Sequence, residues 1–202
     1  MRYFAGFLEL SRQLELADEI KRALLEAPAF TPTMPKTGRP FSVRMTNLGP
    51  LGWVSDRVGG YRYQPTHPQT GQTWPPIPPT AMAIWNELAA YPPPAEACLV
   101  NLYGPRARMS LHRDADEEDF SAPVLSISLG DDCLFRIGGL DRRSATRSVR
   151  LRSGDVLLLE GESRLAYHGV DRVYPGTSTI LGEDLPGVAR VNLTLRRVTR
   201  PR

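Results

Sequence analysis

The chain has 202 residues, enough for one domain with a single hydrophobic core, and its 41% hydrophobic and 23% charged residues exclude a disordered or collagen-like protein. Its formal net charge of +3 would suit a polyanionic partner such as nucleic acid. Nearly all of the cations are arginine, with Lys21 and Lys36 the only lysines, so the codon composition of the source explains this balance equally well.

We do not expect the N-terminal segment to be a signal peptide. Residues 1–10 carry Arg2 and Glu9 around a short apolar patch and lack a small-residue cleavage site. No apolar run in the sequence approaches the ~20 residues that span a bilayer. We therefore expect a cytoplasmic protein without a membrane partner, and we expect it to be a monomer.

Two helices and one strand are predicted in the first half of the chain. Apolar residues recur at three- and four-residue steps over 10–27, as on one side of a helix that Pro28 ends. Residues 41–46 alternate between apolar and polar, which is typical of a strand with one buried face. A second helix is expected over 80–91. The segment 47–79, rich in Pro, Gly and aromatic residues, is predicted to be a long functional loop.

From residue 97 onward the sequence is typical of an all-β region. Short apolar segments are separated by Gly, Asp and Arg clusters, which favours a sandwich or barrel over alternating strands and helices. The predicted strands are 97–103, 108–112, 123–129, 133–137, 147–151, 155–159, 164–168 and 188–197. Cys98 and Cys133 are too isolated for a disulfide framework or a zinc site, and we expect buried thiols.

Two histidines and an aspartate have the spacing of an iron site. His112 and Asp114 lie one residue apart at the end of a predicted strand, so both side chains point to the same face. His168 closes a second predicted strand. Two imidazoles and one carboxylate form a facial triad, which leaves positions on iron(II) open for an oxoacid and for O2. An H-x-D pair alone is common by chance and is usually structural.

The segment from Arg190 to Arg196 predicts an anion site. Its polar residues alternate with hydrophobic ones, so Arg190, Asn192, Thr194 and Arg196 share one face of a strand. A solvated face would need no function. Inside a barrel, however, two arginines would need anionic partners, because unpaired buried charge costs several kcal/mol, and a five-carbon dicarboxylate would satisfy both. Further hydrogen bonds to its carboxylates are expected from Asn101 and Tyr103.

These motifs, taken together and in this order, resemble the AlkB family of iron(II)- and 2-oxoglutarate-dependent dioxygenases. The matching stretches are Val43-Arg-Met45-Thr-Asn47, Leu51-Gly-Trp53, Asn101-Leu-Tyr103, Leu111-His112-Arg-Asp114-Ala-Asp116-Glu117, Ser126-Ile-Ser128-Leu-Gly130, Gly154-Asp155, Gly161-Glu-Ser-Arg164, Tyr167-His168-Gly169 and Arg190-Val-Asn192-Leu-Thr194-Leu-Arg196. The resemblance covers roughly residues 40–197. In combination these stretches are far more specific than the H-x-D…H pattern alone.

The resemblance implies a single dioxygenase domain over 1–202, mainly β, with flanking N-terminal helices. Its core would be a double-stranded β-helix, or jelly roll, over about 97–197, and residues at about 40–80 would form a nucleotide-recognition lid. The implied iron ligands are His112, Asp114 and His168. The implied 2-oxoglutarate ligands are Asn101, Tyr103, Arg190, Asn192 and Arg196.

The activity that the resemblance implies is oxidative demethylation of alkylated bases, such as 1-methyladenine and 3-methylcytosine, in the repair of DNA alkylation damage. The reaction would use iron(II), O2 and 2-oxoglutarate, and would release formaldehyde, succinate and CO2. The partner would be methylated single- or double-stranded DNA, or RNA.

A base must leave the stack to reach such a centre, and a flipped base is held between aromatic faces. Trp53 is the predicted stacking partner, opposite His112, and Asp116 is the predicted contact of the exocyclic amine. Tyr61 and Tyr63 are predicted to contact phosphates. The full set of implied substrate-binding residues is Met45, Trp53, Tyr61, Arg62, Tyr63, Asp116 and Arg142. Without the resemblance, these residues would be ordinary packing and solvated charges.

The sequence departs from the family pattern at three places. Leu159 stands where a tryptophan is expected, an insertion lies near 178–186, and the chain begins about where the first core strand should already be under way. Two other functions stay open. A 2-oxoglutarate oxygenase acting on a small molecule, a lipid or a protein side chain would not use Trp53, Tyr61 or Asp116 to read a base. A jelly-roll module would bind metal without turnover.

Overall fold

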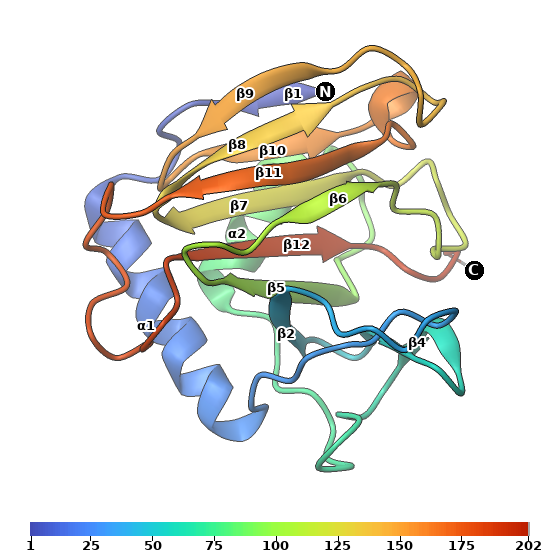
Figure 1. Ribbon diagram of the computed structural model, residues 1–202, viewed down its shortest axis with the longest axis horizontal. Coiled ribbons are helices and arrows are strands. Elements are labelled where there is room, and N and C mark those ends of the chain that lie inside the picture. The colour runs from blue at the N-terminus through green and yellow to red at the C-terminus, as the bar shows by residue number, and fades with distance from the viewer. Residues whose placement is uncertain (202) are drawn as a thin grey trace.

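Two antiparallel sheets face each other at the centre of the structure, a computed structural model that describes residues 1–201 (Figure 1). The strands of the larger sheet are β1 (Arg2–Phe4), β2 (Val43–Leu48), β5 (Ala97–Tyr103), β7 (Val124–Gly130), β10 (Val156–Leu159) and β12 (Arg190–Arg196). The strands of the smaller sheet are β6 (Met109–His112), β8 (Asp132–Ile137), β9 (Arg147–Leu151) and β11 (His168–Tyr174). The strand orders confirm the predicted jelly roll: they are β1-β10-β7-β12-β5-β2 in the larger sheet and β6-β11-β8-β9 in the smaller one.

The two helices cover the outer face of the larger sheet (Figure 1). α1 (Leu10–Glu26) and α2 (Pro79–Leu88) confirm the two predicted helices, and their buried sides include Ile20 and Trp85, each 1% exposed. α2 ends at Leu88, earlier than predicted, because Ala90 takes a positive φ of 48° that no α-helix contains. Within the described part of the chain, no helix combines the length and apolar character needed to cross a membrane.

A second apolar cluster lies between the two sheets. It joins Leu157 and Leu159 of β10 to residues of β5, β8 and β11. Leu159, which stands where the resemblance leads us to expect a tryptophan, is 3% exposed and packs within this cluster. Cys98 and Cys133 are buried and free, as predicted.

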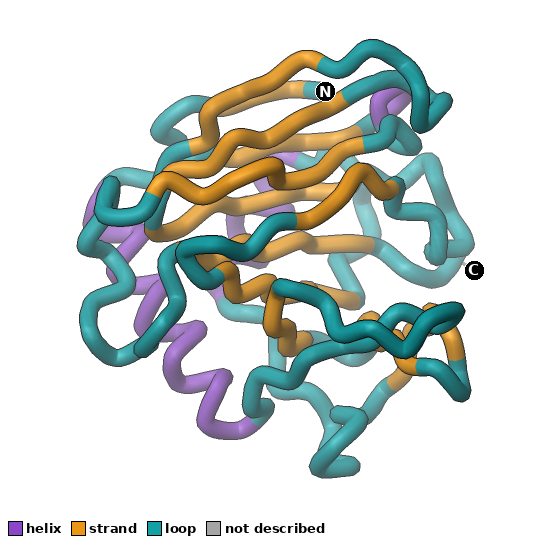
Figure 2. Tube along the Cα trace, in the orientation of Figure 1, coloured by secondary structure: helices purple, strands orange, loops and turns teal. Residues whose placement is uncertain are grey.

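A β-hairpin interrupts the segment that was predicted as a loop. β3 (Gly52–Asp56) and β4 (Gly60–Gln64) form a separate two-stranded sheet, drawn in Figure 2 as two short strands among the loops below the main sheets. The loop prediction for 47–79 is therefore wrong over these residues. Glycines at both strand starts and half-exposed aromatic side chains hide the alternation on which strand prediction depends.

The predicted strand over 164–168 is also wrong. Residues 161–163 form a 3-10 helix, and the turn continues to Ala166, whose N–H bonds the carbonyl of Ser163. His168 therefore begins β11 instead of closing a strand. A bulge after Val170 leaves Asp171 and Arg172 both exposed, so β11 lacks the alternation of a regular strand.

The insertion near 178–186 leaves the register of β12 intact. The carboxylate of Asp131 accepts the N–H groups of Gly176 at 3.0 Å and Ser178 at 2.9 Å, which fixes the start of this connection. β12 then pairs with β5 and β7 along its whole length, from Arg190 to Arg196. At the other end of the chain, β1 was not predicted and pairs with β10 at the edge of the larger sheet.

Candidate active site

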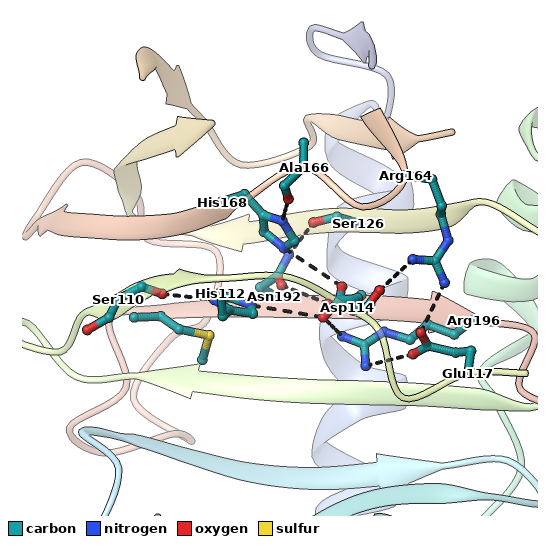
Figure 3. A network of polar contacts seen from close by, with 12 residues as sticks. Ser110, His112, Asp114, Glu117, Ser126, Arg164, Ala166, His168, Asn192 and Arg196 are labelled. Carbon is teal, nitrogen blue, oxygen red and sulfur yellow. Dashed lines mark hydrogen bonds and ion pairs between the residues drawn. The ribbon is translucent and has the colours of Figure 1, made fainter. Parts of the chain in front are cut away.

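The structure brings together the three residues predicted to bind iron. His112 ends β6 and faces His168 at the start of β11, because these two residues are direct partners in the strand pair. Asp114 follows β6, and the ligand atoms of the three residues all lie within 4.8 Å of one another (Figure 3). Two imidazoles and a carboxylate at this distance have the donor set of an iron(II) site, so these residues fit the metal.

Backbone hydrogen bonds fix both imidazoles. Nδ1 of His112 donates to the carbonyl of Ser110, and Nδ1 of His168 donates to that of Ala166, each at 2.9 Å. The Nε2 atoms remain available to a metal and face the Asp114 carboxylate, which lies 4.0 Å from Nε2 of His112 and 3.7 Å from Nε2 of His168. Burial, with the nearby His112, also lowers the pKa of His168 to about 4, so its ring is neutral at physiological pH.

Two arginines keep the Asp114 carboxylate ionised. Burial alone would raise its pKa, yet the positive charge of Arg196, with smaller contributions from the two histidines and Arg164, lowers it to about 2. Nη2 of Arg196 lies 2.8 Å from Oδ1 of Asp114. Arg164 donates to the Asp114 backbone carbonyl at 2.8 Å and pairs with Glu117 at 3.0 Å (Figure 3).

The residues predicted to bind 2-oxoglutarate share the inner face of the larger sheet. Tyr103 pairs with Arg190, and Asn101 pairs with Asn192, so these side chains project from β5 and β12 toward the smaller sheet. Asn192 donates to Ser126 Oγ at 2.7 Å and to a backbone carbonyl, so its amide nitrogen is already engaged. Among the described residues, the hydroxyl of Tyr103 has one hydrogen-bond partner, the sulfur of Met109 at 3.9 Å.

Buried polar atoms without partners mark where the cosubstrate fits. Nε of Arg190 and Nε of Arg196 are buried and have no hydrogen-bond partner among the residues that the structure describes, and the same holds for Oδ1 of Asn101. The two arginines are 1% and 6% exposed. The unpaired N–H donors of two buried guanidiniums suit anionic acceptors, so Arg190 and Arg196 fit a dicarboxylate, whereas the unpaired oxygen of Asn101 needs a donor.

The β3–β4 hairpin places an aromatic cluster beside the acidic segment that follows Asp114. The indole N–H of Trp53 donates to Oδ2 of Asp116 at 2.8 Å, and its ring stacks on Tyr61 with centroids 5.5 Å apart. The structure thus joins two of the predicted base-reading residues, Trp53 and Asp116, although they come from distant parts of the sequence.

Other predicted substrate residues lie away from solvent or away from this cluster. The hydroxyl of Tyr63, predicted to contact phosphate, is buried between Glu117 and Arg196. Arg62 folds back on its own hairpin and pairs with an aspartate of β3 at 2.8 Å. Met45 is 1% exposed in the inter-sheet cluster. Arg142 is exposed in the turn between β8 and β9.

Sequence reasoning did not place Arg164 and Glu117 in the site. Both are buried, and the Glu117 side chain has no exposed surface. The available signal was weak: Glu117 looked like part of a solvated acidic run, and Arg164 appeared only within a stretch that carries the resemblance.

Comparison with known proteins agrees with this geometry. The family model of the 2OG-Fe(II) oxygenase superfamily matches residues 1–196. The alpha-ketoglutarate-dependent dioxygenase AlkB homolog of Caulobacter vibrioides is 50% identical over 192 residues, which cover 95% of this chain and 84% of that protein. The alpha-ketoglutarate-dependent dioxygenase AlkB of Escherichia coli is 38% identical over 187 residues, covering 91% and 83%. The solved structure of OsALKBH1 superimposes with a TM-score of 0.76 at 31% identity and 97% coverage of both chains. The chain therefore belongs to the AlkB family of iron(II)- and 2-oxoglutarate-dependent dioxygenases.

Proposed function

We propose that this enzyme removes methyl groups oxidatively from methylated nucleic-acid bases such as 1-methyladenine and 3-methylcytosine, and so reverses alkylation damage. The observation that carries the proposal is the contact between Trp53 and Asp116, two residues beyond the metal-binding Asp114. A flipped base is held by an aromatic face, and a base methylated at these nitrogens is cationic, which a carboxylate favours. Oxygenases of small molecules or protein side chains have no need of this pair.

The protein's own residues supply binding and orientation. His112, Asp114 and His168 would hold iron(II), and Arg190 and Arg196 would donate hydrogen bonds to the carboxylates of 2-oxoglutarate. Iron(II) and 2-oxoglutarate, when bound with O2, supply the oxidising chemistry that releases the methyl group as formaldehyde. The apolar cluster between the sheets borders this centre, with the ring of Phe135 packed against that of His168.

We further propose that the enzyme acts in the cytoplasm as a monomer, on single- or double-stranded DNA or on RNA. Its formal net charge of +3 favours contact with phosphates. Size-exclusion chromatography with light scattering would test the monomer. Competition between matched methylated DNA and RNA strands would rank the substrates.

The test of function uses protein loaded anaerobically with iron(II). Air, 2-oxoglutarate and a single-stranded oligonucleotide with one 1-methyladenine or 3-methylcytosine are added, and the oligonucleotide mass and succinate are followed. We expect loss of one methyl group with an equal amount of succinate, no reaction in His112→Ala, and no mass change in the unmethylated strand. Succinate formation without demethylation would contradict the nucleic-acid substrate. If the iron-loaded protein formed neither succinate nor a demethylated strand, that result would contradict catalysis.

A further inference from the structure

Glu117 is a buried carboxylate that the reaction described so far does not use. Its Oε1 accepts the hydroxyl proton of Tyr63 and lies 3.4 Å from Nη1 of Arg196. Its Oε2 accepts from Nη2 of Arg164 at 3.0 Å (Figure 3). Because its side chain is fully buried, these are charge-assisted contacts in a dry environment, and each oxygen is held by a cation.

Arg164 prevents Glu117 from moving. The guanidinium of Arg164 is 2% exposed, and its three nitrogens donate to three separate acceptors: the carbonyls of Ala122 and Asp114, each at 2.8 Å, and Glu117. These acceptors all belong to the irregular segment between β6 and β7. Arg164 therefore fixes that segment, and Glu117 with it, against the core.

Arg196 is fixed in turn at two of its three nitrogens. Nη2 lies 2.8 Å from Oδ1 of Asp114, and Nη1 donates to the hydroxyl of Tyr63 at 3.0 Å. A planar guanidinium held at both Nη atoms cannot rotate, so its buried Nε–H keeps one direction. Like Nε of Arg190, this buried Nε–H has no partner among the described residues.

We propose that Glu117 and Tyr63 are positioning residues for the cosubstrate: they hold the guanidinium of Arg196 so that its Nε–H stays available to a carboxylate of 2-oxoglutarate. The proposal rests on the assignment of Arg196 to the cosubstrate. Tyr63 is the direct partner of Trp53 in the β3–β4 hairpin. The hairpin therefore serves two ligands, since Trp53 faces the base-reading carboxylate while Tyr63 supports the cosubstrate site.

Tyr63→Phe tests the proposal without changing any charge. It removes one hydrogen bond to the Arg196 guanidinium and one to Glu117, and hydrogen bonds to charged groups support a change of about 10-fold or more in affinity. The matched control is Tyr91→Phe, which removes a tyrosine hydroxyl that donates to Asp119 at 2.8 Å, on the same segment but away from Arg196. The measurement is calorimetric titration of 2-oxoglutarate into the full chain loaded anaerobically with iron(II).

We expect about a 10-fold weaker Kd for 2-oxoglutarate in Tyr63→Phe and a wild-type Kd in Tyr91→Phe, with similar melting temperatures for the two metal-free variants. Glu117→Gln tests the direction in which the Kd for 2-oxoglutarate changes. Removing a negative charge near a dianion would tighten binding if only electrostatics mattered, whereas the loss of orientation weakens it. Tighter binding in Glu117→Gln, or a wild-type Kd in Tyr63→Phe, would overturn the proposal.

Arg196→Gln distinguishes the cosubstrate-binding role of Arg196 from the positioning role of Tyr63 and Glu117. If this variant binds 2-oxoglutarate like the wild type, the assignment of Arg196 fails and the positioning role fails with it. If Arg196→Gln loses binding while Tyr63→Phe keeps it, the assignment stands and only the positioning role is overturned. Should Glu117→Gln fail to fold, Tyr63→Phe still decides, because it conserves the ring and every charge.

Discussion

Arg190 gives a prediction in which stability and function change in opposite directions. Its guanidinium is 1% exposed and donates only to neutral acceptors, Ser128 Oγ at 2.6 Å and the Asp131 carbonyl at 3.0 Å. Burying such a charge costs several kcal/mol, while the loss of its two hydrogen bonds costs about 2–3 kcal/mol. Arg190→Met, whose side chain is of similar length, should therefore stabilise the ligand-free protein by about 1–2 kcal/mol, which corresponds to a rise in Tm of about 2–8 °C.

The same variant should lose its response to the cosubstrate. At 2-oxoglutarate concentrations near 100 times Kd, binding stabilises the wild type by about 2.7 kcal/mol, and Arg190→Met should gain almost nothing. Thermal unfolding of the iron-loaded proteins under anaerobic conditions, with and without 2-oxoglutarate, measures both effects. Arg172→Met, which removes an exposed arginine of β11, is the control. A ligand-free Arg190→Met protein less stable than wild type, or one with the full 2-oxoglutarate response, would contradict this prediction.

Three further predictions concern the centre and its rim. Burial lowers the pKa of His168 to about 4, from an unfolded value of 6.5, so the unfolded chain takes up the proton first as the pH falls. The metal-free protein should therefore lose up to about 3 kcal/mol of its free energy of unfolding between pH 6.5 and pH 4, as urea unfolding would show. A free energy of unfolding that does not change over this range would be inconsistent with a buried neutral ring. A Cβ at Gly169 would lie 2.4 Å from the Met109 carbonyl oxygen. Gly169→Ala should therefore lower the free energy of unfolding by about 1–3 kcal/mol and weaken iron(II) binding, as thermal unfolding and metal titration would show. Wild-type values in both measurements would contradict this packing. Trp53→Ala should raise KM for a methylated oligonucleotide roughly 10- to 100-fold and leave the Kd for 2-oxoglutarate unchanged, whereas an unchanged KM would remove Trp53 from base binding.

The centre could be predicted because its pattern is local. His112 and Asp114 are separated by one residue, and the polar residues of β12 alternate strictly from Arg190 to Arg196. Period two fixes the face of a strand whatever the rest of the chain does. The structure brings the three predicted metal ligands within 4.8 Å of one another, and both arginines are buried.

The supporting shell could not be predicted because its burial depends on distant partners. Glu117 is buried only because Arg164 and Arg196 reach it from 47 and 79 positions along the chain. In the sequence, Glu117 stands among other acidic residues and resembles a solvated run. Tyr63 was assigned to phosphate for a similar reason: nothing within the hairpin indicates that its hydroxyl turns toward the core.

Charge at the centre explains why metal and cosubstrate belong together. Two buried guanidiniums at the centre, Arg164 and Arg196, are balanced by the carboxylates of Asp114 and Glu117. Arg190 donates instead to the hydroxyl of Ser128 and the backbone carbonyl of Asp131. Iron(II) alone would add two positive charges to this dry interior, and 2-oxoglutarate alone would add two negative ones, each at a desolvation cost. Bound together they leave the net charge unchanged. The alternation that buries both Arg190 and Arg196 therefore selects a dicarboxylate, since a monocarboxylate would leave a further positive charge unbalanced beside the metal.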